Sequence, residues 1–569
     1  MVRFSRKVIL LLLLVLVLLS LVVRYPLVQH ERNQTDSYAM HLYSKSIVDQ
    51  GYAKWTFNPL SYLGYYPLSY PSGVPFLLAE IAEITGTDIE LSILLFNLLL
   101  AVIFCFGVFG LSREFLSRPE YALLATFFTV MGARFVDTSY WDGSARAPMV
   151  VLLTLAVFAA FRSSSFGQRR LILVACVLAL GCFATHHMAL LLVLFGIAYV
   201  LAAFQVRFLL PRFRTHKTRA AVAWNLTMLV AVIVTAFALF EYFGNLALMN
   251  LRRSSLFDLE PALLSVFLNT GVTYANQIGV VLLCVLFAVP IILWRSYLST
   301  ERLFLITLPI AFIPMLGDPI YVSMLLSPFV ACLGTVWISR LAKSSRKKAV
   351  AVLLVSLFVA TIFTPLWSSY RWNSAEYLSG DMVQVDSRVY SDATYLGIMY
   401  PSAFAICSNM QALWIQLAAH SETKFSAGGM FAVIYGDITF ADVKRNVTWS
   451  DRGFPTNLYN WFEYNDEPNF EALVQGMFIY GIGFAKSSGG LADSGGYFAS
   501  HSKMLAIMDN SMPYEYAGTY ARQHSSLAVQ LENAQWQSNQ PNHGEIKDLS
   551  SYMIYASGRI SVFALQLPP

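Results

Sequence analysis

Residues 8–23 read VILLLLLVLVLLSLVV, an apolar run that is broken only by Ser20 and that follows the basic residues Arg6 and Lys7. An α-helix needs about 20 apolar residues to cross the hydrocarbon core of a bilayer, and this run is close to that length. A basic start followed by an apolar run is also typical of a secretory signal, but no convincing small-residue cleavage site precedes Arg24 and further apolar runs follow. We therefore predict a retained membrane anchor.

Similar apolar runs recur along the chain as far as Trp367. The 569 residues are 56% hydrophobic and only 13% charged, with a mean hydropathy of +0.55, which is typical of a polytopic membrane protein and excludes an ordinary soluble domain. The pattern predicts about eleven membrane spans by length and hydropathy, at residues 8–24, 91–111, 120–135, 146–161, 171–185, 188–206, 220–242, 279–294, 303–317, 321–339 and 349–367.

Charged residues divide between alternate loops. One set of loops is rich in arginine and lysine, and the other set carries the acidic residues Asp36, Asp137, Asp142, Asp258 and Glu260. Basic residues near span ends stay in the cytoplasm during insertion, so we expect the N-terminus inside and the acidic loops outside the plasma membrane. The net charge of +5 follows from this topology and indicates no nucleic-acid partner.

An odd number of spans places the chain after Trp367 outside the membrane. We predict an α-helical polytopic domain at 1–367, with a long outer loop at 25–90, and a soluble extracytoplasmic domain at 368–569. Short apolar runs such as 560–567 favour strands, and 412–419 favours a helix, so we predict a mixed α/β structure for the outer domain. Five of the six cysteines lie in apolar spans, which argues against a disulfide framework.

The acidic residues of the outer loops are the main candidates for chemistry. Asp36 begins an expected interfacial helix at 35–49, where it could also serve simply as a helix cap. Asp137 and Asp142 lie in the short loop RFVDTSYWDGSAR, residues 134–146, where the alternative is a solvated turn that pairs them with its two arginines. A row of carboxylates at the outer boundary predicts chemistry on a substrate presented from the bilayer.

Other polar residues at the outer boundary are weaker candidates. His186 and His187 stand at the end of a span, where an ionisable pair is costly unless it is used or fully hydrogen-bonded. Arg252 and Arg253 form an adjacent basic pair that suits either a phosphate group or lipid headgroups.

The order of these motifs resembles a known family. Asp36-x-Tyr38-x-x-His41 follows the first span, Ala53-Lys54-Trp55 and the Tyr70–Gly73 stretch come next, and the acidic second loop follows. The chain is similar here to the GT-C class of polytopic glycosyltransferases, and most similar to the catalytic subunit of oligosaccharyltransferase and its archaeal relatives. The resemblance covers the first 190 residues best and the overall architecture throughout. It implies transfer of a sugar from a polyprenyl- or dolichyl-phosphate carrier at the outer leaflet.

Position by position, the resemblance implies that Asp36 is the first-loop catalytic carboxylate and Asp142 the leading acid of the second-loop motif. The chain departs from the family at Ser144, where a second acid is usual, and at 407–414, where a Trp-Trp-Asp-Tyr-Gly motif is expected. These departures argue against recognition of an Asn-x-Ser/Thr peptide acceptor and against a bound divalent metal such as Mg²⁺ or Mn²⁺. Such a metal would be held by Asp36 and Asp142, with Glu260 if the three converge.

A mechanism follows from these assignments. Asp36 would deprotonate the acceptor hydroxyl as the anomeric carbon becomes cation-like, giving inversion. Asp142 would orient the acceptor or help to bind the metal. The remaining residues expected to line the substrate cavity are Asp137, His41, His186, His187, Arg252, Arg253 and Glu260. The acceptor is a glycan, a lipid or a protein.

Three alternatives stay open beside this interpretation. One is protein N-glycosylation of the oligosaccharyltransferase kind. Another is a GT-C scaffold without catalytic activity, which the changes at Ser144 and 407–414 keep open. The last is a lipid or solute transporter, although transporters usually show repeats and midplane ionisable residues that this sequence lacks.

Overall fold

The computed structural model describes most of the helical part of the chain and a few strands after it. The described residues are 4–27, 31, 35–51, 56–57, 65–66, 71–213, 215–243, 263–294, 298–316, 319–342, 347–373, 395, 404–407, 424–427, 504–509, 553–556 and 560–565. By internal contacts the chain divides into two compact units. Unit 1 comprises Met1–Leu27 and Leu94–Ser374, and unit 2 comprises Val28–Ile93 and Ala375–Pro569. The domain limits at 367 and 368 stay a prediction.

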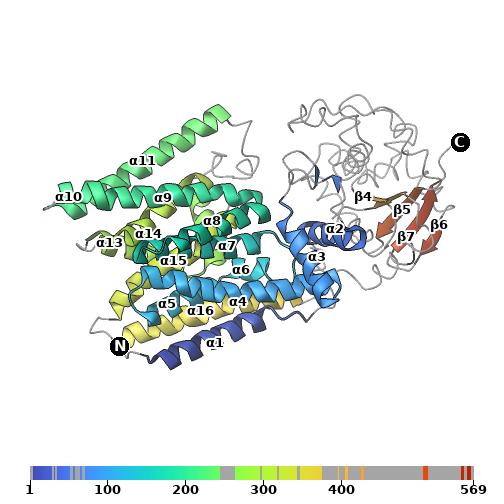
Figure 1. Cartoon of the computed structure of the whole chain (residues 1–569), viewed down its shortest axis with the longest axis horizontal. Coiled ribbons are helices and arrows are strands. Elements are labelled where there is room, and N and C mark those ends of the chain that lie inside the picture. The colour runs from blue at the N-terminus through green and yellow to red at the C-terminus, as the bar shows by residue number, and fades with distance from the viewer. Residues whose placement is uncertain are drawn as a thin grey trace. The chain divides into compact units, whose positions relative to one another are not determined.

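Unit 1 is helical (Figure 1). Its helices are α1 (Arg6–Val23), α4 (Ile89–Phe115, from Leu94 on), α5 (Pro119–Val130), α6 (Ala133–Thr138), α7 (Arg146–Phe166), α8 (Arg170–Thr185), η1 (His187–Leu191), α9 (Leu192–Phe204), η2 (Gln205–Leu209), α10 (Leu210–Arg212), α11 (Lys217–Phe243), α12 (Leu263–Ile278), α13 (Val281–Trp294), α14 (Thr300–Ala311), η5 (Ile313–Met315), α15 (Pro319–Leu341) and α16 (Lys347–Asn373).

Long apolar helices make this an integral membrane protein. Within the described ranges, seven helices are long and apolar enough to cross a bilayer. They are Arg6–Val23, Ile89–Phe115, Arg146–Ser164, Met188–Arg212, Lys217–Thr235, Pro319–Leu341 and Ala351–Tyr370. An eighth span results if the pair Gly271–Ile278 and Val281–Leu293, bent by 102°, counts as one. The prediction of eleven spans therefore stays open.

Several expected spans are short helices. α5 and α14 have 12 residues each, α13 has 14 and α8 has 16, which at 1.5 Å per residue gives lengths of about 18 to 24 Å. Local breakers explain the ends of two of them. α13 begins after Gly279, whose φ of 100° suits a residue without a side chain, and Pro309 lies just before the end of α14.

The core of unit 1 is aromatic. Phe115 of α4, Phe161 of α7, Phe304 of α14 and Phe329 of α15 contact one another with ring centroids 5.0 to 6.1 Å apart. α15 packs against α5, α12 and α13, and 83% of its spanning segment is buried. In contrast, leucine, valine and phenylalanine side chains of α1, α8, α11 and α16 are exposed, as a lipid-facing surface requires.

Unit 2 combines helices with short strands. α2 (Thr35–Gln50) packs against α3 (Gly73–Thr85), and β1 (Thr56–Phe57) pairs antiparallel with β2 (Tyr65–Tyr66). Gly51, with φ 73°, follows α2, and its backbone N–H donates to the Ile47 carbonyl oxygen at 2.8 Å, which closes the helix that was expected at 35–49.

A mixed five-stranded sheet belongs to the same unit and has the order β4-β3-β5-β7-β6. β3 is parallel to β4 and β5, whereas β7 is antiparallel to β5 and β6. The strands are β3 (Phe404–Cys407), β4 (Lys424–Ala427), β5 (Met504–Asp509), β6 (Met553–Ala556) and β7 (Ile560–Leu565). β7 lies within the predicted strand at 560–567, and the predicted helix at 412–419 falls outside the described residues.

Candidate functional site

The acidic loop of the sequence is a buried turn in unit 1. α6 forms one short helix after Gly132 and ends at Thr138, and the chain then turns into α7. Asp137, on α6, is half-buried, whereas Asp142, in the turn after it, is only 2% exposed. Asp142 is therefore not part of a solvated turn. A carboxylate in such surroundings requires fixed polar partners or positive charge nearby.

Asn97 of α4 holds this turn by its backbone. The Asn97 Nδ2 group donates to the carbonyl oxygen of Tyr140 at 2.7 Å and to that of Asp142 at 2.8 Å. A primary amide has two N–H donors, so one side chain satisfies two buried carbonyls and fixes the course of the chain through Asp142. Asn97 is 1% exposed, and it is a site residue that was not predicted from the sequence.

Arg24 reaches the same turn from the end of α1. Its Nε donates to Ser139 Oγ at 2.8 Å, its Nη1 donates to the carbonyl and hydroxyl oxygens of Ser20 at 3.0 and 2.7 Å, and its guanidinium lies 5.0 Å from the centre of the Phe135 ring. Burial lowers the pKa of Arg24 to about 10, against the opposing effects of Cys105 and, less strongly, of Asp137. Arg24 is therefore a cation at neutral pH.

One sequence signal could have found Arg24. It stands at the outer end of the first predicted span, where the positive-inside rule gives no reason for a basic residue. A charge placed against that rule is expected to serve structure or function.

Two further arginines belong to the turn. Burial lowers the pKa of Arg134, and the negative charge of Asp137 opposes this most strongly, with a smaller effect of Asp142. Arg146, at the start of α7, points its Nε toward the Tyr321 hydroxyl at 3.5 Å, and its guanidinium lies 5.6 Å from the Tyr321 ring centre. The turn thus collects three arginines around two aspartates.

Tyr321 of α15 also connects the turn with His186. The His186 and Tyr321 ring centroids are 5.6 Å apart, at an angle of 62°. His186 is 5% exposed, and its Nδ1 accepts a hydrogen bond from the Met188 backbone N–H at 3.0 Å. When neutral, the ring therefore carries its proton on Nε2. The structure brings His186 and the Asp142 turn together, which the sequence could not indicate.

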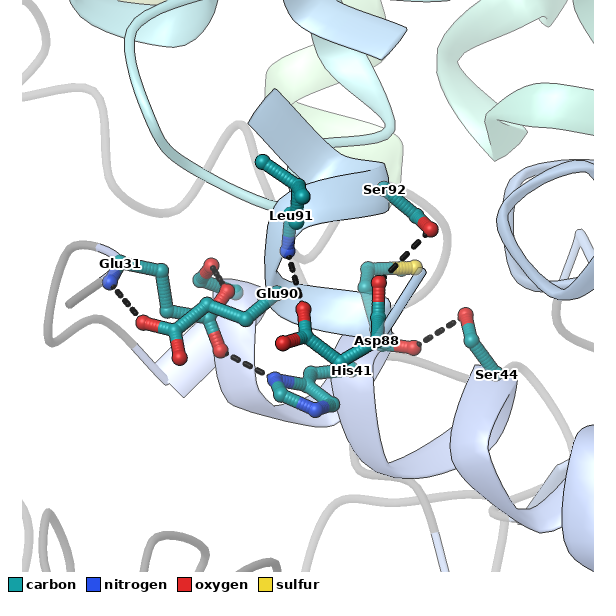
Figure 2. A network of polar contacts seen from close by, with 9 residues as sticks. Glu31, His41, Ser44, Asp88, Glu90, Leu91 and Ser92 are labelled. Carbon is teal, nitrogen blue, oxygen red and sulfur yellow. Dashed lines mark hydrogen bonds and ion pairs between the residues drawn. The ribbon is translucent and has the colours of Figure 1, made fainter. Parts of the chain in front are cut away.

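A second polar cluster, in unit 2, contains His41 (Figure 2). The carboxylate of Glu31 contacts His41 Nδ1 and accepts a hydrogen bond from Ser37 Oγ at 2.9 Å, while the Glu31 backbone N–H donates to Glu90 Oε1. Glu31 is completely buried. Burial raises the pKa of Glu31, Glu90 raises it further, and the attraction of His41 opposes both.

The other predicted site residues are only partly covered. Asp36 is the second residue of α2 and His187 the first of η1, but the side chains of both lie outside the described residues, as do Arg252, Arg253 and Glu260 altogether. No group of three or more metal-ligating side chains occurs among the residues that the structure describes. Asp137 and Asp142 alone, among three arginines, do not fit a divalent cation.

Comparison with known proteins adds evidence at the level of the fold. No protein-family model matches the sequence, and no curated protein is significantly similar to it. Among solved structures, the oligosaccharyltransferase of Archaeoglobus fulgidus in its apo form is 13% identical, with a TM-score of 0.53 over 93% of this chain and 73% of that one. The same enzyme tethered to an acceptor peptide with an NVT sequon is 12% identical, with a TM-score of 0.55 over 99% and 74%.

The chain has the GT-C fold. The predicted resemblance to the GT-C class is thereby confirmed at the level of the fold. A third match is the same archaeal enzyme in complex with Zn and sulfate, 13% identical, with a TM-score of 0.55 over 92% of this chain and 70% of that one.

Proposed function

We propose that this GT-C protein is a glycosyltransferase. It transfers a sugar or oligosaccharide from a polyprenyl-phosphate carrier to an acceptor at the outer face of the membrane, with inversion at the anomeric carbon. The archaeal oligosaccharyltransferase, which has a similar fold, has also been solved in complex with an inhibitory peptide and a dolichol-phosphate. That structure is 12% identical to this chain, with a TM-score of 0.52 over 98% of this chain and 74% of that one.

The observation that carries the proposal is the charge content of the Asp142 turn. The described part of this cluster holds three arginines, Arg24, Arg134 and Arg146, and two aspartates, Asp137 and Asp142, so that positive charges outnumber negative ones by one. A positive excess in a low-dielectric place favours an anionic ligand, and guanidinium groups suit phosphate oxygens in particular. This supports a phosphate-bearing carrier. The pair Arg252 and Arg253 remains a second candidate for phosphate contact.

The reaction needs little besides positioning. The phosphate of the carrier is already a good leaving group, so the arginines only have to stabilise the charge that develops on it. Asp36, near the start of α2, is the proposed carboxylate at the acceptor hydroxyl, and Asp142 orients the acceptor. A divalent metal bound by Asp36 and Asp142 would add Lewis-acid stabilisation of the phosphate.

Transfer from a defined lipid donor tests the function. The purified protein in lipid nanodiscs receives polyprenyl-phosphate-linked sugars and a panel of glycan, lipid and peptide acceptors, and covalent products are separated by mass. Asp36→Asn and Asp142→Asn should each abolish most product, whereas Asp49→Asn, which changes an exposed carboxylate of α2, should not. Full activity in excess chelator would remove the metal from the proposal.

The alternatives give different results in the same system. Products confined to peptides with an Asn-x-Thr sequon would identify protein N-glycosylation. The absence of Trp-Trp-Asp-Tyr-Gly from the sequence argues against that outcome. Counterflow of a solute in proteoliposomes without a covalent product would identify a transporter, and carrier binding without either activity would identify a scaffold.

A further inference from the structure

The cluster around Glu31 has the arrangement of a carboxylate that orients a histidine (Figure 2). Ser37 and His41 lie four residues apart on α2, so both side chains fall on one face of the helix and both reach the carboxylate of Glu31. One carboxylate oxygen contacts His41 Nδ1 and the other accepts from Ser37 Oγ. Glu31 is thereby held in one orientation by two separate contacts.

This arrangement determines how His41 can handle a proton. An Nδ1–H that donates to a carboxylate leaves the lone pair on Nε2, and the negative charge stabilises the imidazolium that forms when Nε2 takes up a proton. In the part of the chain that the structure describes, Nε2 of His41 has no hydrogen-bond partner. The His41 side chain is 14% exposed, while that of Glu31 is at 0%. The imidazole therefore connects a buried carboxylate with a more accessible surface.

The other charged groups near Glu31 either have other partners or are exposed, so Glu31 is the carboxylate that serves His41. Glu90, at the start of α4, accepts from the backbone N–H of Glu31, and Asp88 accepts from the Leu91 N–H at 2.6 Å and so caps α4. The acidic residues of the neighbouring helix α3, Glu80 and Glu83, are exposed. Lys45 and Asp49 pair with each other at 2.7 Å further along α2.

A purely structural tether would not need these residue types. An amide or a second hydroxyl would hold the start of α2 equally well. It would avoid the free-energy cost of burying a carboxylate, which only pairing and hydrogen bonding offset. A carboxylate also has an ordinary pKa of about 4, which makes it a weak proton acceptor near neutral pH, whereas imidazole, at about 6.5, is matched to that task.

The geometry points to His41 as the group that receives the acceptor proton, with Glu31 as its positioning residue. This inference rests on the proposed transferase function and deepens it. As the acceptor oxygen bonds to the anomeric carbon, the bond from that carbon to the phosphate oxygen breaks and its electron pair leaves with the phosphate. The acceptor O–H proton moves to Nε2 of His41, and water removes it later. In this scheme Asp36, on the same helix, polarises the acceptor hydroxyl before the proton moves.

The test is the dependence of kcat on pH in full-length protein in nanodiscs. His41→Gln should lower kcat by about 100-fold, the usual contribution of a general base, with little change in KM, and it should flatten the acid limb of the profile. Glu31→Gln, which keeps an acceptor oxygen but no charge, should lower kcat by about 10-fold and move the acid limb to lower pH. Asp49→Asn is the matched control on α2 and should change neither.

Chemical rescue separates proton transfer from a structural role. Added imidazole should restore part of the kcat of His41→Ala and should have no effect on Asp142→Asn. An unchanged pH profile in His41→Gln, or a change in KM alone, overturns the inference while leaving the transferase intact. Absence of transfer by the wild-type chain from every lipid-linked sugar overturns both the inference and the proposed function.

Discussion

The two polar clusters of this protein manage buried charge in different ways. The Asp142 turn of unit 1 balances its aspartates with arginines, whose charge does not change over the physiological pH range, and it is held by Asn97 of α4 and Arg24 at the end of α1. The Glu31 cluster of unit 2 balances its carboxylate with a histidine, His41, and a hydroxyl. Permanent charges in a rigid frame suit the binding of an anion. A carboxylate and an imidazole suit the movement of a proton.

Removal of Arg24 from the Asp142 turn should cause the largest loss of stability. Arg24→Leu keeps the volume of the side chain roughly but leaves Asp137 without one of its cations, and breaking a buried charge arrangement costs about 3 to 5 kcal/mol. Thermal unfolding in detergent measures the effect. Asp49→Asn is the control, because Asp49 is 51% exposed in its pair with Lys45 and such pairs contribute about 1 kcal/mol or less. Equal losses in both variants would contradict the buried role of Arg24.

Neutralisation of Asp142 should affect activity more than stability. Asp142→Asn preserves the shape of the side chain but removes its charge, and we expect a decrease of about 100-fold in transfer rate, or about 2.7 kcal/mol in activation free energy. The initial rate with a lipid-linked sugar measures it. An unchanged rate would assign Asp142 to the fold alone.

Asn97 tests whether the backbone of the turn matters by itself. Asn97→Leu leaves two buried carbonyls without their donor, each worth about 1 kcal/mol, and should reduce both stability and transfer. The matched variant is Asn225→Leu in α11, where the amide donates to Gln205 Oε1 at 3.2 Å and to the Ala221 carbonyl at 2.8 Å. It removes the hydrogen bonds of a buried amide outside the Asp142 turn and should keep its activity per folded molecule. Loss of activity in both would show that the effect is general.

The smallest effect concerns the second cluster and depends on pH. Because burial raises the pKa of Glu31 above 4.5, the folded chain binds this proton more strongly than the unfolded chain does. Its contribution to stability is fully present below that value and is lost as pH rises through the folded pKa. Glu31→Gln cannot lose a proton, so its melting temperature relative to the wild type should rise with pH. A relative decrease would mean that attraction to His41 outweighs burial.

The sequence indicated the class of fold because membrane insertion is a local property. Each apolar run satisfies its own backbone hydrogen bonds as a helix, and the basic loops orient it, so hydropathy and charge suffice to find most of the long helices. Spans with glycine or proline, such as those at 279–294 and 303–317, were harder to place. There the helices are short, and one pair bends by 102° between Gly271–Ile278 and Val281–Leu293.

The candidate site was found only in part. The acidic loop around Asp142 and the residue His186 are visible in the sequence as polar groups at span boundaries, and His41 is visible as part of the Asp-x-Tyr-x-x-His motif of the first outer loop. Asn97 resembles any polar residue within a long apolar helix, and Tyr321 resembles any aromatic residue near a helix start. Their partners are far away in the chain, at separations of 45 positions for Asn97 and Asp142 and 175 positions for Arg146 and Tyr321.

The amino-acid sequence alone therefore determined that the protein is a helical membrane protein, where most of its long helices lie, and which loops carry acids. The tertiary structure alone decided that Asp142 is buried, that Arg24 and Asn97 hold its turn, and that Glu31 contacts His41. The physical reason is the range of the interactions. Hydropathy and helix formation act between near neighbours along the chain, whereas the partners of a buried charge are selected by packing between helices that the order of residues does not specify.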